Sequence, residues 1–233
     1  MDAKQIPLPS FFPVRVTFDQ FWPGENRQLV NHLQSIAKGL SDWFLYLWGP
    51  LECGKSHLLQ ASCQTAHESG RTAFYLPARN VPACEPELLE GLEDRHLVCI
   101  DDIEVMLGEP TLEQSLFQLF NALRDSGNKL LIASALPPAN LPTRLPDLHS
   151  RINWGVVYRI QGLKDADTLA AIDLCAAELG LRLPVTVRNY LMIRCRRDFR
   201  FLRRLLVELD RASLAEQRAL TVPLVKQVLA GIS

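Results

Sequence analysis

Several features that would assign this sequence to a particular class are missing from it. No uncharged apolar run reaches the roughly 20 residues that span a bilayer. The first ten residues, MDAKQIPLPS, lack the basic and then apolar pattern of a secretory signal. The six cysteines include no C-x-x-C pair, and their spacing fits neither a zinc site nor a disulfide framework. We therefore expect a cytoplasmic protein with free thiols and no membrane partner.

The composition is that of an ordinary globular protein. The chain has 233 residues, of which 48% are hydrophobic and 22% are charged, and its 12 glycines and 15 prolines are too few for a fibrous protein. The net charge of −1 divides unevenly, because residues 1–150 carry −7 and residues 151–233 carry +6. This asymmetry favours two modules and a polar partner for the second, although solvated helix faces explain it equally well.

Apolar stretches of strand length alternate with stretches of helical spacing along the first part of the chain. Strands are expected at 42–48, 72–76, 97–100, 130–134 and 156–160. Helices are expected at 25–38, 55–69, 86–92 and 111–126, the last capped by Thr111 and ended by Gly127. Buried strands that alternate with helices predict an α/β fold in which a parallel sheet is covered on both faces.

The strand signals stop after Ile160, and only helices are expected beyond it, at 165–179, 184–195, 198–214 and 221–230. Prolines at positions 7, 9 and 13 prevent a regular helix near the N-terminus. We therefore expect three parts: an extended tail over 1–17, an α/β domain over 18–162 and an all-helical domain over 163–233.

The residues between the first inner strand and its following helix match the pattern G-x-x-x-x-G-K-S. Glycines let such a loop wrap around phosphates with its N–H groups pointing inward, and the helix dipole adds positive charge. Lys55 is expected to neutralise the β- and γ-phosphates, and the Ser56 hydroxyl is expected to ligate Mg²⁺. The predicted nucleotide-binding residues here are Gly49, Pro50, Leu51, Glu52, Cys53, Gly54, Lys55, Ser56 and His57.

The apolar stretch Leu97–Ile100 ends in two acids, Asp101 and Asp102. An acid at the carboxyl end of a parallel strand lies at the edge of the sheet where open α/β sheets bind ligands. Asp101 is expected to hold Mg²⁺ through water, and Asp102 could polarise an attacking water. Taken alone, the two acids could equally be a strand that runs into an acidic turn.

These two motifs, with a further strand between them and helices after the sheet, resemble the AAA+ superfamily. Four stretches are similar to its DnaA/Hda branch: TFDQFWPGEN (17–26), LVCIDDIE (97–104), LPDLHSRINWG (145–155) and RRDFRFLRRLL (196–206). The resemblance covers nearly the whole chain and is greatest to the Hda group, short paralogues of DnaA. It implies an AAA+ module with a five-stranded P-loop sheet and a small helical lid, without the duplex-binding domain of DnaA that would follow Ser233.

The resemblance gives roles to residues that their spacing alone leaves unassigned. Arg151 falls at the position of an arginine finger that acts in trans on a neighbour's nucleotide, and Arg200 at the lid arginine called sensor 2. By their surroundings alone, these would be an arginine before a strand and a residue of a solvated basic helix. Packing on the nucleobase is implied for Phe18, Phe21 and Trp22, with Asn26 as a candidate at the base edge; the three aromatic residues could instead be a hydrophobic staple.

The tail residues Gln5, Ile6 and Leu8 resemble a short peptide that docks into the replication sliding clamp. Extended apolar peptides fill such clefts, and neighbouring prolines reduce the cost of ordering them. One departure from the family pattern is Ala135, which stands where the family has a polar sensor-1 residue. We therefore expect the chain's own ATP hydrolysis to be weak or absent, with a bound nucleotide that is mainly structural.

The resemblance implies a regulator of chromosome replication initiation. Bound to ADP or another nucleoside phosphate (ATP is possible) and Mg²⁺, and to the DNA-loaded clamp, it would stimulate ATP hydrolysis by DnaA through Arg151. It also implies a homodimer and contact with DNA mainly through the clamp. One alternative is a DNA-binding AAA+ ATPase that acts as an initiator or helicase loader, which the basic C-terminal part supports. Another is a nucleotide kinase, against which the helical domain argues.

Overall fold

The computed structural model describes residues 16–80, 86–194, 199–216 and 219–232. The chain divides into two compact units. The first consists of Met1–Phe18 and Gln28–Ile160, and the second of Asp19–Arg27 and Gln161–Ser233. A short stretch near the N-terminus therefore belongs with the C-terminal helices. Among the described residues, no helix combines the length and the apolar character needed to cross a membrane.

The first unit is built on a five-stranded sheet whose strands all run parallel. The strands are β1 (Phe44–Trp48), β2 (Ala73–Pro77), β3 (Leu97–Asp101), β4 (Lys129–Ser134) and β5 (Val156–Arg159), in the spatial order β2-β3-β4-β1-β5. Each strand overlaps the stretch that the sequence predicts, and β3 is buried along its whole length. The predicted α/β class and parallel sheet are confirmed.

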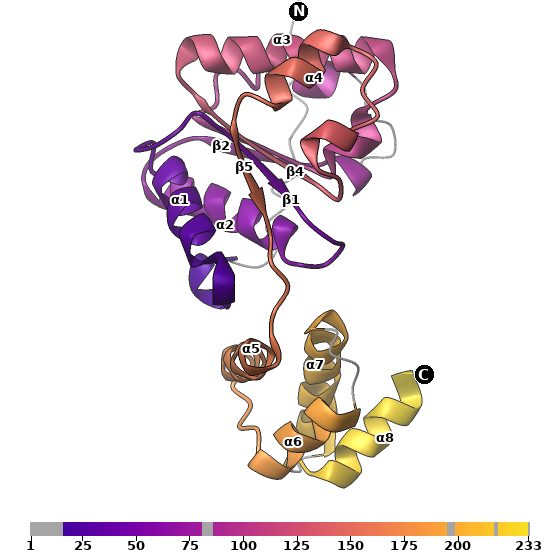
Figure 1. Cartoon of the computed structure of the whole chain (residues 1–233). Helices are drawn as coiled ribbons and strands as arrows, with labels where there is room; N and C mark the ends of the chain where they lie inside the picture. The colour runs from indigo at the N-terminus through magenta and orange to yellow at the C-terminus, as the bar shows by residue number, and fades with distance from the viewer. Residues whose placement is uncertain (1–15, 81–85, 195–198, 217–218, 233) are drawn as a thin grey trace, which may run out of the picture. The chain divides into compact units, whose positions relative to one another are not determined.

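Helices cover both faces of this sheet (Figure 1). Helices α1 (Arg27–Ala37) and α2 (Lys55–Glu68) lie on one face, and α3 (Pro110–Ser126) and α4 (Pro146–Ile152) lie on the other. The face under α3 carries an aromatic cluster, in which the Phe44 and Phe120 rings meet edge to face at 5.0 Å between centroids. Burial of these apolar side chains is the main force that holds the layers together.

The ends of the helices correct two sequence expectations. Thr111 does not cap α3, because Glu109 precedes the helix and its carboxylate accepts a hydrogen bond from the Leu112 amide at 2.8 Å. Pro110 then occupies the first helical position, where its missing N–H is not needed. Gly127 ends the helix with φ 72°, as predicted. The helix expected at 86–92 is shorter, the 3₁₀ turn η4 (Pro86–Leu89), and α4 was not expected at all.

The second unit is helical and has its own core. It contains α5 (Asp165–Glu178), α6 (Val185–Arg194), α7 (Phe199–Glu216) and α8 (Val222–Ile232), each overlapping its predicted range. Buried side chains of all four helices meet in one cluster, including Ile172, Leu191, Leu205, Leu209 and Val225. This arrangement is a helical C-terminal region consistent with an AAA+ lid.

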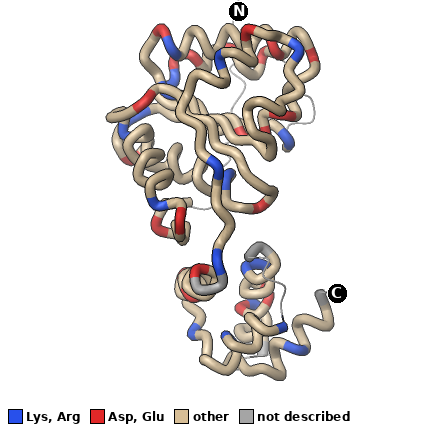
Figure 2. The backbone as a smooth tube through the Cα atoms, viewed as in Figure 1, with Lys and Arg blue, Asp and Glu red and all other residues tan. Residues whose placement is uncertain are grey.

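Charged residues of the second unit are spread over several helices rather than gathered on one (Figure 2). Some of the arginines are neutralised within the unit. Arg188 forms an ion pair with Asp173 at 2.9 Å, and Arg211 forms one with Glu208 at the same distance. These contacts favour solvated helix faces as the explanation of the positive charge of this part.

Candidate functional site

The predicted phosphate loop connects β1 to α2 at the carboxyl edge of the sheet. Gly54 has φ 101°, a left-handed conformation that glycine adopts without strain, and it immediately precedes α2. Gly49 is tightly packed, because an added Cβ would lie 3.0 Å from the Cys53 sulfur and 3.4 Å from the Ile160 carbonyl oxygen. The backbone of the loop therefore requires glycine at position 54, and its close packing favours glycine at position 49.

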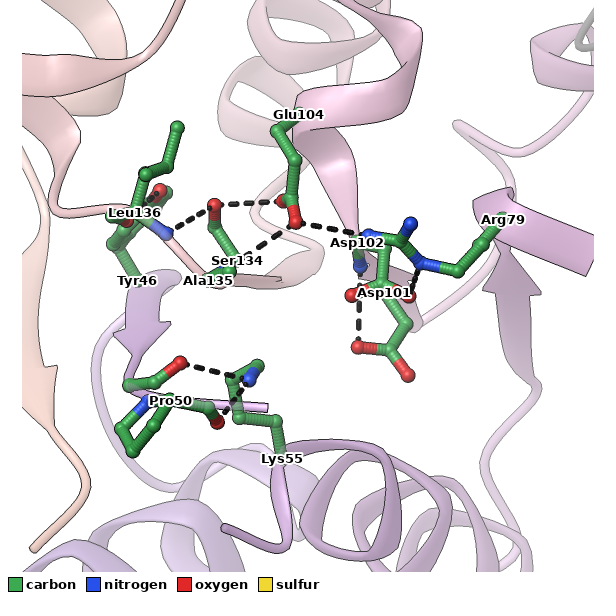
Figure 3. Close-up of polar contacts among 11 residues, drawn as sticks. Tyr46, Pro50, Lys55, Arg79, Asp101, Asp102, Glu104, Ser134, Ala135 and Leu136 are labelled. Carbon is green, nitrogen blue, oxygen red and sulfur yellow. Dashed lines mark hydrogen bonds and ion pairs between the residues drawn. The ribbon is translucent and has the colours of Figure 1, made fainter. Parts of the chain in front are cut away.

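Lys55 turns into this loop and is buried there. Its ammonium group donates hydrogen bonds to the carbonyl oxygens of Gly49 and Pro50, each at 2.9 Å (Figure 3). An ammonium group has three donors, so this arrangement leaves a donor for an incoming anion. The positive charge stands at the start of α2, where the helix dipole also favours anions. The loop is thus suited to phosphate.

Asp101, at the end of β3, is buried and accepts two well-defined hydrogen bonds. The Tyr75 hydroxyl donates to it at 2.8 Å, and the Asp102 amide donates at 3.1 Å. Burial raises the pKa of the Asp101 carboxyl, and hydrogen bonds from Ser56 and Tyr75 oppose that rise. The predicted metal ligands Ser56 and Asp101 therefore lie together.

This pair of oxygen donors fits Mg²⁺, which is usually bound by one or two protein groups, waters and substrate phosphates. Among the described residues, no cluster of three or more histidine, cysteine, aspartate or glutamate side chains could hold a metal by itself. A magnesium ion at this site would thus depend on nucleotide phosphates for part of its coordination.

Asp102 is held in an ion pair that the sequence did not predict. Its backbone is left-handed, with φ 56°, and its carboxylate accepts a hydrogen bond from Arg79 Nε at 2.9 Å. The same guanidinium also contacts the Glu104 carboxylate at 3.3 Å (Figure 3). The Asp102 carboxylate is thus already engaged by Arg79, rather than free as the sequence suggested.

The tip of β4 is tied to the same network. Glu104 accepts hydrogen bonds from the Ser134 hydroxyl at 2.7 Å and from the Ala135 amide at 3.3 Å. Ser134 in turn accepts a bond from the Leu136 amide at 3.0 Å. Ala135 thus takes part only through its backbone, and the hydroxyl of the adjacent Ser134 is already used by Glu104. The sequence did not identify Tyr75, Arg79 or Glu104 as site residues, because the partners that they contact lie 23 or more positions away.

Arg151 lies in the last turn of α4 and is far in sequence from the residues of the phosphate loop. Its guanidinium carbon lies 4.0 Å from the centre of the Trp154 ring and 5.9 Å from that of Phe117. In the part of the chain that the structure describes, Arg151 has no ion pair with a carboxylate. Cation–π contacts with aromatic rings therefore stabilise its positive charge.

The aromatic residues predicted at the nucleobase are divided between the two units. Phe18 is buried in the unit that holds the phosphate loop, where His57 donates a hydrogen bond to the Thr17 carbonyl at 2.9 Å. Phe21 and Trp22 belong to the second unit, and the Trp22 indole N–H donates to Asp167 at 3.0 Å. The structure thus groups only Phe18 with the loop.

Asn26, in the same short segment, pairs reciprocally with Gln161. Its amide nitrogen donates to the Gln161 carbonyl at 2.9 Å, and its oxygen accepts from the Gln161 N–H at 2.8 Å. These bonds explain why Asp19–Arg27 groups with the helices.

Some predicted residues lie outside what the structure describes. The clamp peptide residues Gln5, Ile6 and Leu8 precede the described part of the chain. Arg200 lies in the first turn of α7, but its side chain is not among those described.

Two family models match this chain. The model described as Hda, lid domain, matches residues 165–229, and the bacterial DnaA ATPase domain matches residues 84–159. Domain III of the Thermotoga maritima replication initiation protein DnaA has a similar structure, with a TM-score of 0.81, 21% identity, and coverage of 93% of this chain and 96% of that one.

Two further solved structures are similar. DnaA bound to AMPPCP and single-stranded DNA has a TM-score of 0.74 and 22% identity over 85% of this chain and 66% of that one. The Thermotoga maritima RuvB Holliday junction branch migration motor has a TM-score of 0.69 and 15% identity, over 93% of this chain and 72% of that one. At these identities, the structural likeness supports the fold.

Proposed function

Because this chain is a DnaA/Hda-like AAA+ protein, related to replication-initiation factors, we propose that it regulates initiation in trans. It binds a nucleotide and the DNA-loaded sliding clamp, and it supplies Arg151 to the ATP that DnaA holds. Hydrolysis then converts the initiator to its ADP form. The observation that carries this proposal is Arg151 itself, a guanidinium that is supported by rings and unpaired with any described carboxylate.

The chemistry of the transferred phosphoryl group explains why such an arginine is effective. Negative charge spreads over the equatorial oxygens in the transition state, and a guanidinium donates to them in a planar fork. An arginine supplied in trans accelerates hydrolysis by about 10³ to 10⁵ in comparable systems, which corresponds to about 4–7 kcal/mol. DnaA would supply the remaining parts of that site.

The chain's own nucleotide has a different role in this proposal. Lys55 and Ser56 hold the phosphates, and Asp101 holds Mg²⁺ through water. At the same edge, Ala135 offers no polar side chain to orient a water, and Asp102 is engaged by Arg79. We therefore assign the bound nucleotide, ADP, mainly to folding and assembly, with slow hydrolysis at most.

The remaining partners follow from the family resemblance. Gln5, Ile6 and Leu8 dock into the β subunit sliding clamp of DNA polymerase III, so that contact with DNA is mainly indirect. Two copies of the chain form a homodimer. Each contact can be measured separately from hydrolysis.

The test is a single hydrolysis assay. DnaA is loaded with radiolabelled ATP, the clamp is loaded on primed DNA, and the protein is added as wild type or as Arg151→Ala. We expect conversion to ADP that requires the clamp and disappears in Arg151→Ala, while binding of clamp and nucleotide is unchanged. Arg144→Ala is the matched control, because Arg144 is exposed and shortly precedes α4. Full stimulation by Arg151→Ala would refute the proposal.

A second candidate function is a DNA-binding AAA+ ATPase that acts as an initiator or helicase loader. The charge of +6 over residues 151–233 favours it, and a related DnaA has been solved with single-stranded DNA. The ion pairs of Arg188 and Arg211 weigh against an uninterrupted basic surface. Salt-dependent DNA binding without the clamp, together with ATP turnover by this protein alone, would favour the second function.

A further inference from the structure

The aromatic support of Arg151 comes mainly from Trp154, three positions further along the chain. The guanidinium carbon lies 4.0 Å from the centre of the Trp154 ring, well inside the range of a cation–π contact. The Trp154 side chain is 59% exposed, so it contributes little to the core of the unit. A large exposed ring covered by a cation is a feature that packing alone does not require.

The backbone fixes Trp154 on both of its sides. Before it, the last turn of α4 is closed by the Trp154 amide, which donates to the Arg151 carbonyl at 3.0 Å. The Asn153 side chain also donates to the His149 carbonyl at 2.8 Å. After it, Gly155 packs so closely on the Phe44 ring that an added Cβ would lie 2.2 Å from a ring carbon. The ring therefore stands on a well-anchored turn.

Stacking supports a guanidinium without using its donors. An ion pair with a carboxylate would occupy two of the five N–H groups and neutralise the charge. A ring face contacts the plane of the group instead and leaves its N–H edges free. A long arginine side chain loses rotamer freedom when it is ordered, and a platform that orders it beforehand reduces the cost of presenting it to a partner.

We propose that Trp154 is a positioning residue for Arg151: its ring holds the guanidinium in place and unpaired with any described carboxylate, available to the phosphates of a nucleotide bound by another AAA+ subunit. This inference rests on the proposed function. It adds that the maximal rate of the stimulated reaction depends on an aromatic ring at position 154, whereas association of the two proteins does not.

The test compares Trp154→Phe, which keeps a ring, with Trp154→Leu, which keeps apolar bulk without one. The rate of hydrolysis of DnaA-bound ATP is measured against the concentration of this protein on clamp-loaded DNA. For Trp154→Leu we expect a maximal rate lower by about 2- to 5-fold, the factor that corresponds to an exposed cation–π contact. The half-saturating concentration should stay unchanged, and Trp154→Phe should retain most of the wild-type rate.

A spectroscopic measurement follows the stack directly. The Nε–H proton of Arg151, assigned by its loss in Arg151→Ala, should be shifted upfield by the indole ring in the wild type. This shift should be absent in Trp154→Leu. Unchanged nucleotide binding and melting temperature of the variants would show that they remain folded.

The outcomes separate the two ideas. A maximal rate of Trp154→Leu equal to the wild-type rate, with Arg151→Ala inactive, overturns the positioning role and leaves the proposed function intact. An increased half-saturating concentration at an unchanged maximal rate overturns it too, because Trp154 would then be a partner contact. Full activity of Arg151→Ala refutes the proposed function itself, and the positioning role with it.

Discussion

The buried carboxylate of Glu113 anchors the segment that leads into α4. Its removal should lower the free energy of unfolding by an amount that can be worked out from these contacts. Glu113, in the first turn of α3, is fully buried. Its carboxylate accepts hydrogen bonds from the amides of Gly108 at 2.7 Å, Arg144 at 2.9 Å and Leu145 at 2.7 Å. The Thr143 hydroxyl adds a fourth, at 3.0 Å. Two loops are thus joined to α3 through one side chain.

The substitution Glu113→Gln keeps the shape of this side chain and changes its hydrogen bonding. A carboxylate accepts at both oxygens, whereas the amide of glutamine presents an NH₂ donor in place of one of them. That donor would face backbone N–H groups. A hydrogen bond to a charged acceptor contributes about 1.5–3 kcal/mol, and an unsatisfied buried group costs about 1–3 kcal/mol. We therefore expect a loss of about 2–4 kcal/mol, a large part of a typical stability of about 5–15 kcal/mol.

Urea unfolding followed by tryptophan fluorescence measures this loss. Three of the four tryptophans lie in the unit that contains Glu113, and Trp22 lies in the other. The fluorescence change therefore reports mainly on the unit that the substitution affects. The control is Glu90→Gln, because Glu90 is exposed. A stability of Glu113→Gln within about 0.5 kcal/mol of the wild type, the range of ordinary surface substitutions, would refute the reasoning.

The same carboxylate makes stability depend on pH. Burial alone would raise the pKa of Glu113, but the hydrogen bonds from the amides and from Thr143 outweigh it and hold the pKa below its ordinary value of 4.5. A lowered pKa contributes stability that is fully present above the pKa of the unfolded chain and is lost as the pH falls through the folded value. The difference between wild type and Glu113→Gln should therefore be constant near neutral pH and shrink below about 4.5.

Three further substitutions test other parts of the structure. Lys55→Ala should weaken ADP binding at least 10-fold in calorimetric titration, because it removes a charge-assisted contact worth about 1.5–3 kcal/mol; unchanged affinity would contradict the phosphate assignment. Gly155→Ala should lower stability by about 1–3 kcal/mol through its clash with Phe44, whereas Gly162→Ala, which meets nothing within 4 Å, should not. Asn26→Ala should accelerate hydrogen exchange at the Gln161 amide, its direct partner, and protection equal to the wild type would argue against that bond.

Local sequence patterns were enough to predict the fold, because the inner strands such as β1 and β3 are buried apolar runs and helices such as α1 and α7 are amphipathic. The phosphate loop was recognisable because its glycines and Lys55 are consecutive in the sequence and lie between a strand and a helix. Helix α4 escaped prediction because its seven residues offer only Leu148 and Ile152 as buried positions. The cap of α3 was misassigned to Thr111, although Pro110 at the first helical position pointed to the preceding residue.

The contacts that complete the site could not be predicted in the same way. Arg79 meets Asp102 across 23 positions, and Ser134 meets Glu104 across 30. No periodicity links such pairs, since only the order of strands in the sheet brings them together. The partner of Arg151 is near in sequence, but its stacking depends on how the turn after α4 is anchored on Phe44.

The assignment of Asp19–Arg27 to the helical unit has a practical consequence for dissecting this protein. The backbone passes between the units at residues 18–19, 27–28 and 160–161, so the helical unit is discontinuous in sequence. A fragment that starts at residue 163 would lose Gln161 together with Asn26, and it would leave Asp167 without the indole of Trp22. A transplantable version of this unit therefore needs the nine N-terminal residues 19–27, fused through a new linker to residue 161.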